Sequence, residues 1–166
     1  MPELKAELSV SSLDNLLSDL NSYKEKLEMA PQKIEADIAE IGASSIEDTL
    51  SNITDQDGNS AGTVGIEETE NGIKVFNQGK QIAFLEYGTG EKGVKNSHPY
   101  SGKANWKYNS GTKIRHTKNG KRMWKYWDRL RGHWRITNGI PAQMQVYNAA
   151  LKMREEIPHA AKEALK

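Results

Sequence analysis

The sequence predicts an α+β fold in a single domain, 1–166, from three observations. Apolar residues recur at helical spacing near both ends of the chain, over 12–54 and 141–165. Apolar and polar residues alternate over 63–87, as they do in β-strands. The remaining stretch, 88–139, combines 8 glycines with all 4 tryptophans. A chain of this length can bury a core without a metal or a disulfide.

Two tandem helices are predicted near the N-terminus. Leu13 and Leu20 belong to the apolar face of an amphipathic helix over 12–29. Pro31 interrupts this pattern and fits the first turn of a second helix, because that position needs no amide donor. The apolar stripe of the second helix continues to about Thr54.

A three-stranded antiparallel β-meander is predicted to follow. Asn71-Gly72 separates its first two strands, and both central positions of a type I′ turn require the positive φ that these residues tolerate. The expected strands are 63–69, 73–77 and 81–87.

The stretch 88–139 is predicted to be a long, basic, aromatic-rich loop stiffened by a β-hairpin. Disordered linkers are poor in aromatic residues, whereas Trp124 and Trp127 lie in an alternating segment that suits a strand. Residues 134–136 are the expected partner strand, joined to the first across 128–133.

One further helix is predicted over 141–165. Pro141 is suited to its first turn, and Met144 and Leu151 lie on its broad apolar face. Pro158 should kink or end it before a short terminal turn.

Charge is distributed unevenly along a chain whose net charge is only +1. Residues 1–72 contain 16 acids and 4 bases, whereas 92–135 contain 13 bases and 1 acid. Such asymmetry indicates a basic surface for an acidic partner or complementary faces that meet between identical subunits. Lysine and arginine interleaved with tryptophan and tyrosine are typical of nucleic-acid binding, but protein interfaces share this enrichment. We therefore rank a protein interface first, intramolecular packing second and nucleic acid third.

Catalytic and metal-binding patterns are weak. The chain has no cysteine, so thiol nucleophiles and thiolate zinc sites are excluded. His116 and His133 would need several carboxylates for nuclease chemistry, yet Asp128 is the only acid within 92–135. Gly88-Thr89-Gly90 is not expected to precede the helix that a phosphate-binding loop requires. We expect no enzymatic activity, no cofactor and no metal. We also expect no membrane partner, because no apolar run is long enough to span a bilayer.

A series of short motifs gives the chain a family resemblance. Residues 81–90 contain aliphatic and aromatic residues, then Glu, an aromatic residue and Gly-Thr-Gly. Further motifs follow in order: His98-Pro99, Trp106-Lys107-Tyr108, the run 120–126, the run 134–141 and Tyr147-Asn148-Ala149-Ala150. Together they resemble the HK-ninety-seven-type minor tail-component family, the neck and tail-completion proteins of siphophages and related prophages. The resemblance covers about 30–155.

The resemblance implies a non-enzymatic virion protein of α+β fold. It would assemble as a ring of identical subunits, such as a hexamer, at the head–tail junction or the head-proximal end of the tail. There it would be needed for head–tail joining and would contact connector, tail terminator or tail tube proteins. It would reside in the virion neck or tail, after assembly in the host cytoplasm. The alternative function is a basic nucleic-acid-binding module that contacts phage DNA.

The candidate assembly residues are the motif positions together with aromatic and basic residues of the arm. They are Glu86, Gly88, Thr89, Gly90, Trp106, Tyr108, Lys121, Arg122, Trp124, Tyr126 and Trp134. The Thr89 hydroxyl is expected to bind nearby backbone and fix the direction of the arm. Glu86 is expected to pair with the basic arm of its own or a neighbouring subunit.

Overall fold

A computed structural model describes residues 10–53, 61–104, 106, 115–116, 120 and 122–166. Its helices and two small antiparallel sheets confirm the α+β class. In chain order the elements are α1 (Val10–Leu50), β1 (Thr63–Thr69), β2 (Gly72–Gln78), α2 (Ile82–Tyr87), α3 (Gly90–Lys95), β3 (Arg115–His116), β4 (Arg122–Asp128), β5 (His133–Thr137), β6 (Gly139–Ile140) and α4 (Gln145–Ala164).

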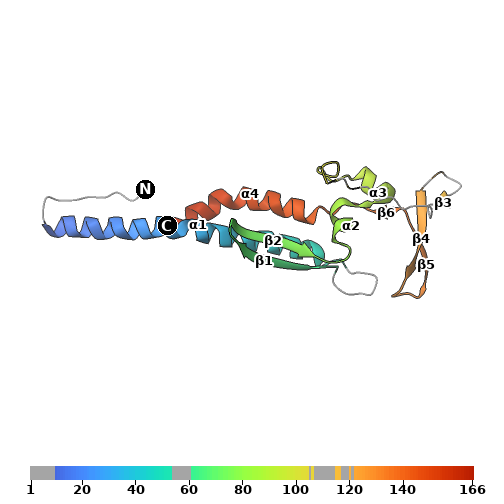
Figure 1. Cartoon of the computed structure of the whole chain (residues 1–166), viewed down its shortest axis with the longest axis horizontal. Helices are drawn as coiled ribbons and strands as arrows, with labels where there is room; N and C mark the ends of the chain where they lie inside the picture. The colour runs from blue at the N-terminus through green and yellow to red at the C-terminus, as the bar shows by residue number, and fades with distance from the viewer. Residues whose placement is uncertain (1–9, 54–60, 105, 107–114, 117–119, 121) are drawn as a thin grey trace.

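The molecule is elongated and organised along α1 (Figure 1). Helix α4 runs antiparallel beside the C-terminal half of α1, and the β1–β2 hairpin lies along the same half. The short elements α2, α3 and β6 come next. The β4–β5 hairpin projects at the end of the molecule farthest from the start of α1 (Figure 1).

The buried core lies where α1, α2 and α4 meet. Ile46 and Leu50 of α1 pack with Leu85 of α2, Ala149 of α4 and Ala61. Helix α1 ends at Leu50, earlier than the predicted end near residue 54. Of the helices described, none combines the length and the apolar character needed to cross a membrane.

The predicted break at Pro31 is wrong, because α1 continues through it as one helix of 41 residues. A proline inside a helix lacks a donor and crowds the preceding turn, which costs about 3 kcal/mol. Burial offsets this cost, since Ala30 and Ile38 on either side are both buried. Helix α4 also reaches this region, where Lys26 Nζ donates to the carbonyl of Lys166 at 3.1 Å.

The predicted third strand over 81–87 is also wrong, because this segment forms helix α2. Ile82 and Leu85 are three residues apart and both contact the core, which is the spacing of one helix face. Over so short a segment, the spacing of Ile82 and Phe84 does not distinguish the two-residue period of a strand from the 3.6-residue period of a helix. The predicted meander is therefore a two-stranded hairpin, β1–β2.

The tip of the β1–β2 hairpin differs from the predicted type I′ turn. Thr69 pairs with Gly72, so Glu70 and Asn71 form the loop. Of these residues, Gly72 alone has a positive φ, of 120°. The Thr69 hydroxyl donates to the Gly72 carbonyl at 2.7 Å, which closes the hairpin one residue earlier than expected.

The arm over 88–139 contains more regular structure than predicted. Helix α3 begins at Gly90, the last residue of Gly88-Thr89-Gly90, so the expectation that this motif does not lead into a helix is wrong. The predicted hairpin is confirmed as β4 paired with β5, with Trp127 directly opposite Trp134. Strand β3 pairs with the other edge of β4 and completes a three-stranded sheet.

Helix α4 starts later than predicted, and of the two outcomes expected at Pro158, a kink or an end, it does not show the end. It begins at Gln145 rather than at Pro141, and it continues past Pro158. Beyond that proline Ala160 is buried, so packing again offsets the local cost. The late start has a specific cause, because the carboxylate of Glu86 binds the first amides of the helix.

Candidate functional site

Glu86 is buried at the end of α2 and caps α4 from a distant part of the chain. Its Oε2 accepts from the amide of Val146 at 2.9 Å, and its Oε1 accepts from the amide of Tyr147 at 3.0 Å. These donors belong to the first turn of α4, whose amides lack partners within the helix. Met144, at the cap position, makes no side-chain cap hydrogen bond. Glu86 therefore performs the capping role, and its charge is favoured by the helix dipole.

His98 completes the coordination of this carboxylate. Its Nε2 lies 3.0 Å from Oε1 of Glu86, and its Nδ1 accepts from the amide of Tyr100 at 3.0 Å. Because Nδ1 is an acceptor, the ring proton lies on Nε2 and is donated to Glu86. Both side chains are buried and have structural partners, so the pair presents neither an open base nor an open acid to a substrate.

An aromatic cluster surrounds the pair. Tyr87 stacks on Trp106 with ring centroids 5.4 Å apart and contacts His98 at 4.7 Å. Trp106 Nε1 donates to the carbonyl of Gly88 at 3.1 Å, so the indole also holds the motif backbone. The cluster consists of Phe84, Tyr87, His98, Tyr100, Trp106 and Tyr147.

The Gly-Thr-Gly part of the motif binds the segment that leads into α4. Thr89 and Gly90 form bridges with Ile140 and Gly139, respectively. The Thr89 hydroxyl accepts from the amide of Ile140 at 3.1 Å, which confirms the expected backbone contact. A Cβ on Gly139 would lie 1.9 Å from the Thr89 carbonyl oxygen, and φ there is +115°. Only glycine permits this approach.

These contacts define one structural unit, which we call the joint. It closes three separated segments onto one another through hydrogen bonds of the Glu86 carboxylate, the Thr89 hydroxyl and the Trp106 indole. The joint comprises Glu86, Tyr87, Gly88, Thr89, Gly90, His98, Trp106, Gly139, Ile140 and the first turn of α4. Glu86 was expected to pair with the basic arm of its own or a neighbouring subunit, and within the described chain it pairs with one residue of the arm, His98, rather than with a lysine or arginine. Its described partners are His98 and two backbone amides.

The inner face of the β4–β5 hairpin contacts the joint. A Cβ on Gly90 would meet the ring of Trp124 at 2.7 Å, so this indole covers the motif backbone. Asp128 on the same face accepts from Arg131 Nη1 at 3.1 Å and Arg135 Nη1 at 3.2 Å. Burial acts to raise the pKa of Asp128, but hydrogen bonds from Arg131 and Arg135 outweigh it and lower that pKa.

The outer face of the same hairpin is exposed. Trp127 and Trp134 meet edge to face at 5.6 Å, and their exposed fractions are 43% and 62%. Ile136, two residues from Trp134 on the same face, is also exposed. Successive residues of a strand point to opposite faces, so this surface faces away from Trp124 and the joint.

The predicted assembly residues thus divide into two groups. Glu86, Gly88, Thr89, Gly90 and Trp106 lie in the joint, whereas Trp124, Tyr126 and Trp134 lie on the hairpin. Tyr108, Lys121 and the side chain of Arg122 fall outside the described residues.

Sequence reasoning missed His98, Gly139 and Trp127 as site residues. The positions of Trp127 and Trp134, symmetric about the turn, were a signal for the exposed tryptophan pair. No comparable signal identified the contact between His98 and Glu86, because Glu86 lies twelve residues earlier, in α2, and His98 follows α3.

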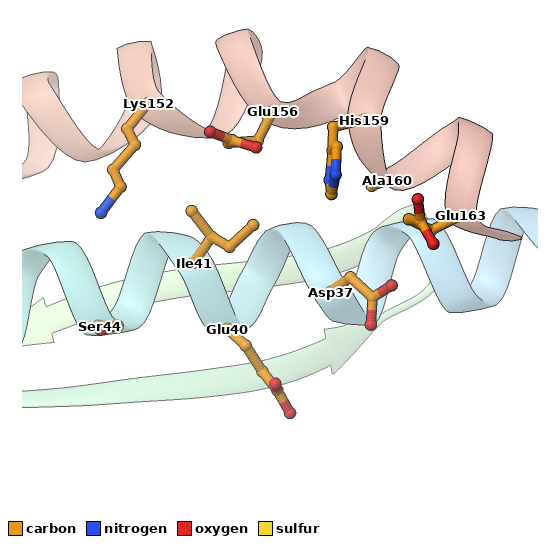
Figure 2. Close-up of a pocket in the computed structure, with 9 residues that line it drawn as sticks. All are labelled: Asp37, Glu40, Ile41, Ser44, Lys152, Glu156, His159, Ala160 and Glu163. Carbon is orange, nitrogen blue, oxygen red and sulfur yellow. The ribbon is translucent and has the colours of Figure 1, made fainter.

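An acidic groove lies between α1 and α4 (Figure 2). Its volume is about 500 Å³, and it is lined by Asp37, Glu40, Ile41, Ser44, Lys152, Glu156, His159, Ala160 and Glu163. Figure 2 shows Lys152 and His159 reaching toward α1, while Glu40 is directed away from α4. A hydrogen bond from Lys166 lowers the pKa of Glu163. Within the described residues no three acidic or histidine side chains are arranged to hold a metal ion.

No protein-family model, curated protein or solved structure matches this chain significantly.

Proposed function

We propose that this chain is a structural neck or tail-completion protein of a long-tailed bacteriophage. In this proposal it forms a ring of identical subunits at the head–tail junction or the head-proximal end of the tail. Its neighbours would be the connector, the tail terminator or tail tube proteins, and it would be needed to join heads to tails.

The proposal depends on one observation, the structural role of the Glu86 to Gly90 motif that carries the family resemblance. Within this motif, the carboxylate of Glu86 and the hydroxyl of Thr89 bind other segments of the same chain and leave no open reactive site. The joint holds a hairpin with exposed tryptophans at one end of an elongated subunit. A rigid base that presents an aromatic surface suits an assembly role, because aromatic residues and arginine are enriched at protein interfaces.

The test is disruption of the gene in the phage or prophage that encodes the chain. We expect intact heads and intact tails that remain unjoined in electron micrographs, and recovery when the wild-type gene is supplied in trans. Normally joined particles from the disrupted phage would overturn the proposal.

The second candidate, a DNA-binding module, is favoured by one observation. The stretch 92–135 holds 13 bases and 1 acid together with exposed aromatic rings. If it binds DNA, a gel-shift titration should show affinity falling steeply with salt, because phosphate neutralisation releases counterions. The assembly proposal expects no shift.

A further inference from the structure

Two groups of exposed large apolar residues lie at opposite ends of the molecule. One group, the helix patch, lies on the N-terminal half of α1 and consists of Leu13, Leu17, Leu20, Tyr23 and Leu27. The other, the hairpin patch, lies on β4–β5 and its turn and consists of Trp127, Leu130, Trp134 and Ile136. An exposed apolar patch of this kind on a protein surface marks an interaction site.

The helix patch continues a row of residues that is covered elsewhere. At spacings of three and four, the same face of α1 runs on to Ile38 and Ile41. There α4 lies alongside: Ile38 is buried, and Ile41 lines the groove between the two helices. Between Leu13 and Leu27, the described part of the chain leaves this row exposed. The exposed part is therefore built like a helix face that packs against another element.

The two patches carry opposite charge. Residues 122–137, around the hairpin patch, contain 5 bases and 1 acid, Asp128. Two of these bases, Arg131 and Arg135, already bind that acid. Residues 10–30, around the helix patch, contain 4 acids and 2 bases. An approach between these two surfaces is therefore electrostatically favourable.

We propose that the hairpin patch of one copy docks on the helix patch of a second copy. Pairing either patch with itself would bring like charges together and leave the other patch exposed. One contact between unlike patches covers both, and repeating it around an axis generates a closed ring. This inference rests on the proposed function, because it assigns the contact by which the ring forms.

The experiment uses two variants of the full chain, each altered at one patch. The hairpin variant is Trp127→Ser with Trp134→Ser, and the helix variant is Leu17→Ser with Leu20→Ser. Sedimentation velocity should show self-association of the wild type below about 1 mM. We expect each variant alone to associate about tenfold more weakly or worse, because interface anchors are lost.

The decisive sample is an equimolar mixture of the two variants. Each variant keeps one intact patch, so the mixture should form a 1:1 complex that grows no further. Association of the hairpin variant alone would indicate symmetric pairing of helix patches and overturn the inference. Association of the helix variant alone, or a wild type that stays monomeric throughout the concentration range, would also overturn it.

A charge exchange keeps the inference testable if a serine variant fails to fold. Lys125 lies on the outer face of β4, and Asp19 lies beside the helix patch. Lys125→Glu and Asp19→Lys should each weaken association, and the chain with both should recover it; no recovery would count against the contact. Unjoined phage particles with a monomeric wild type would refute this contact alone, whereas association in solution with normally joined particles would refute the proposed function alone.

Discussion

The joint and the outer face of the β4–β5 hairpin are neighbours that follow opposite rules. In the joint, Glu86 and His98 are buried, and both carboxylate oxygens and both ring nitrogens have a hydrogen-bond partner. On the outer face, Trp127 and Trp134 are exposed, and their rings contact one another. The comparison shows that the most distinctive sequence motif, Glu86 to Gly90, holds segments of the same subunit together. The proposed assembly surfaces lie outside Glu86 to Gly90.

The largest effect is expected from Glu86→Ala. It removes the acceptor of two helix amides and of His98 Nε2, leaving three donors without their partner in a buried site. We expect a loss of about 3 to 5 kcal/mol in the free energy of unfolding, measured with urea.

The matched control for this variant is Glu67→Ala. Glu67 pairs with Lys74 at 3.2 Å on the exposed β1–β2 hairpin, where such a pair contributes about 0 to 1 kcal/mol. Equal losses in the two variants would show that burial of Glu86 in the joint has no energetic consequence.

A second effect is expected from Gly139→Ala, of about 2 kcal/mol or more in unfolding free energy. The added Cβ would lie 1.9 Å from the Thr89 carbonyl oxygen in a backbone with φ of +115°. Gly132→Ala is the control, because φ there is +65° and no atom lies within 4 Å of the new Cβ. It should cost only the backbone strain, about 1 kcal/mol. If the two alanines cost the same, close backbone approach does not hold the joint together.

A smaller, pH-dependent effect is expected at Asp128. Its pKa is lowered in the folded protein, so its contribution is present above the unfolded pKa and lost as pH falls through the folded pKa. The difference in unfolding free energy between wild type and Asp128→Asn should be constant above about pH 5 and shrink below about pH 4. Tryptophan fluorescence reports this, since three of the four tryptophans lie on the hairpin. A difference that stays constant down to pH 3 would contradict the assignment.

Local patterns predicted the elements whose period is maintained over many residues. The 3.6-residue row of α1 and the two-residue alternation of β1, β2, β4 and β5 appear as expected. The prediction at Pro31 failed because the effect of proline is local, whereas the burial of Ala30 and Ile38 that offsets it depends on elements packed on α1 from later in the chain. Segment 82–87 was misjudged because six residues are too few to separate the two periods.

The joint could be predicted only in part for a similar reason. A hydroxyl between two glycines indicates a backbone contact, and Thr89 makes one. The partner of Glu86 could not be predicted, because amides at 146 and 147 become available only when α4 starts at Gln145. That start in turn depends on Glu86, so the two features specify one another across 60 residues of sequence.

The smallest effect on stability is expected from Trp134→Ala, which bears directly on the comparison between the two regions. Trp134 is 62% exposed and its described ring contact is Trp127, so the loss should stay below about 1 kcal/mol. Trp124→Ala, on the inner face over Gly90, should cost about 2 kcal/mol or more because it opens the packing against the joint. Self-association should respond in the reverse order, with Trp134→Ala the more damaging. A Trp134→Ala chain that melts as early as Trp124→Ala would place the outer face in the subunit's own packing, and the distinction between the joint and the assembly surface would fail.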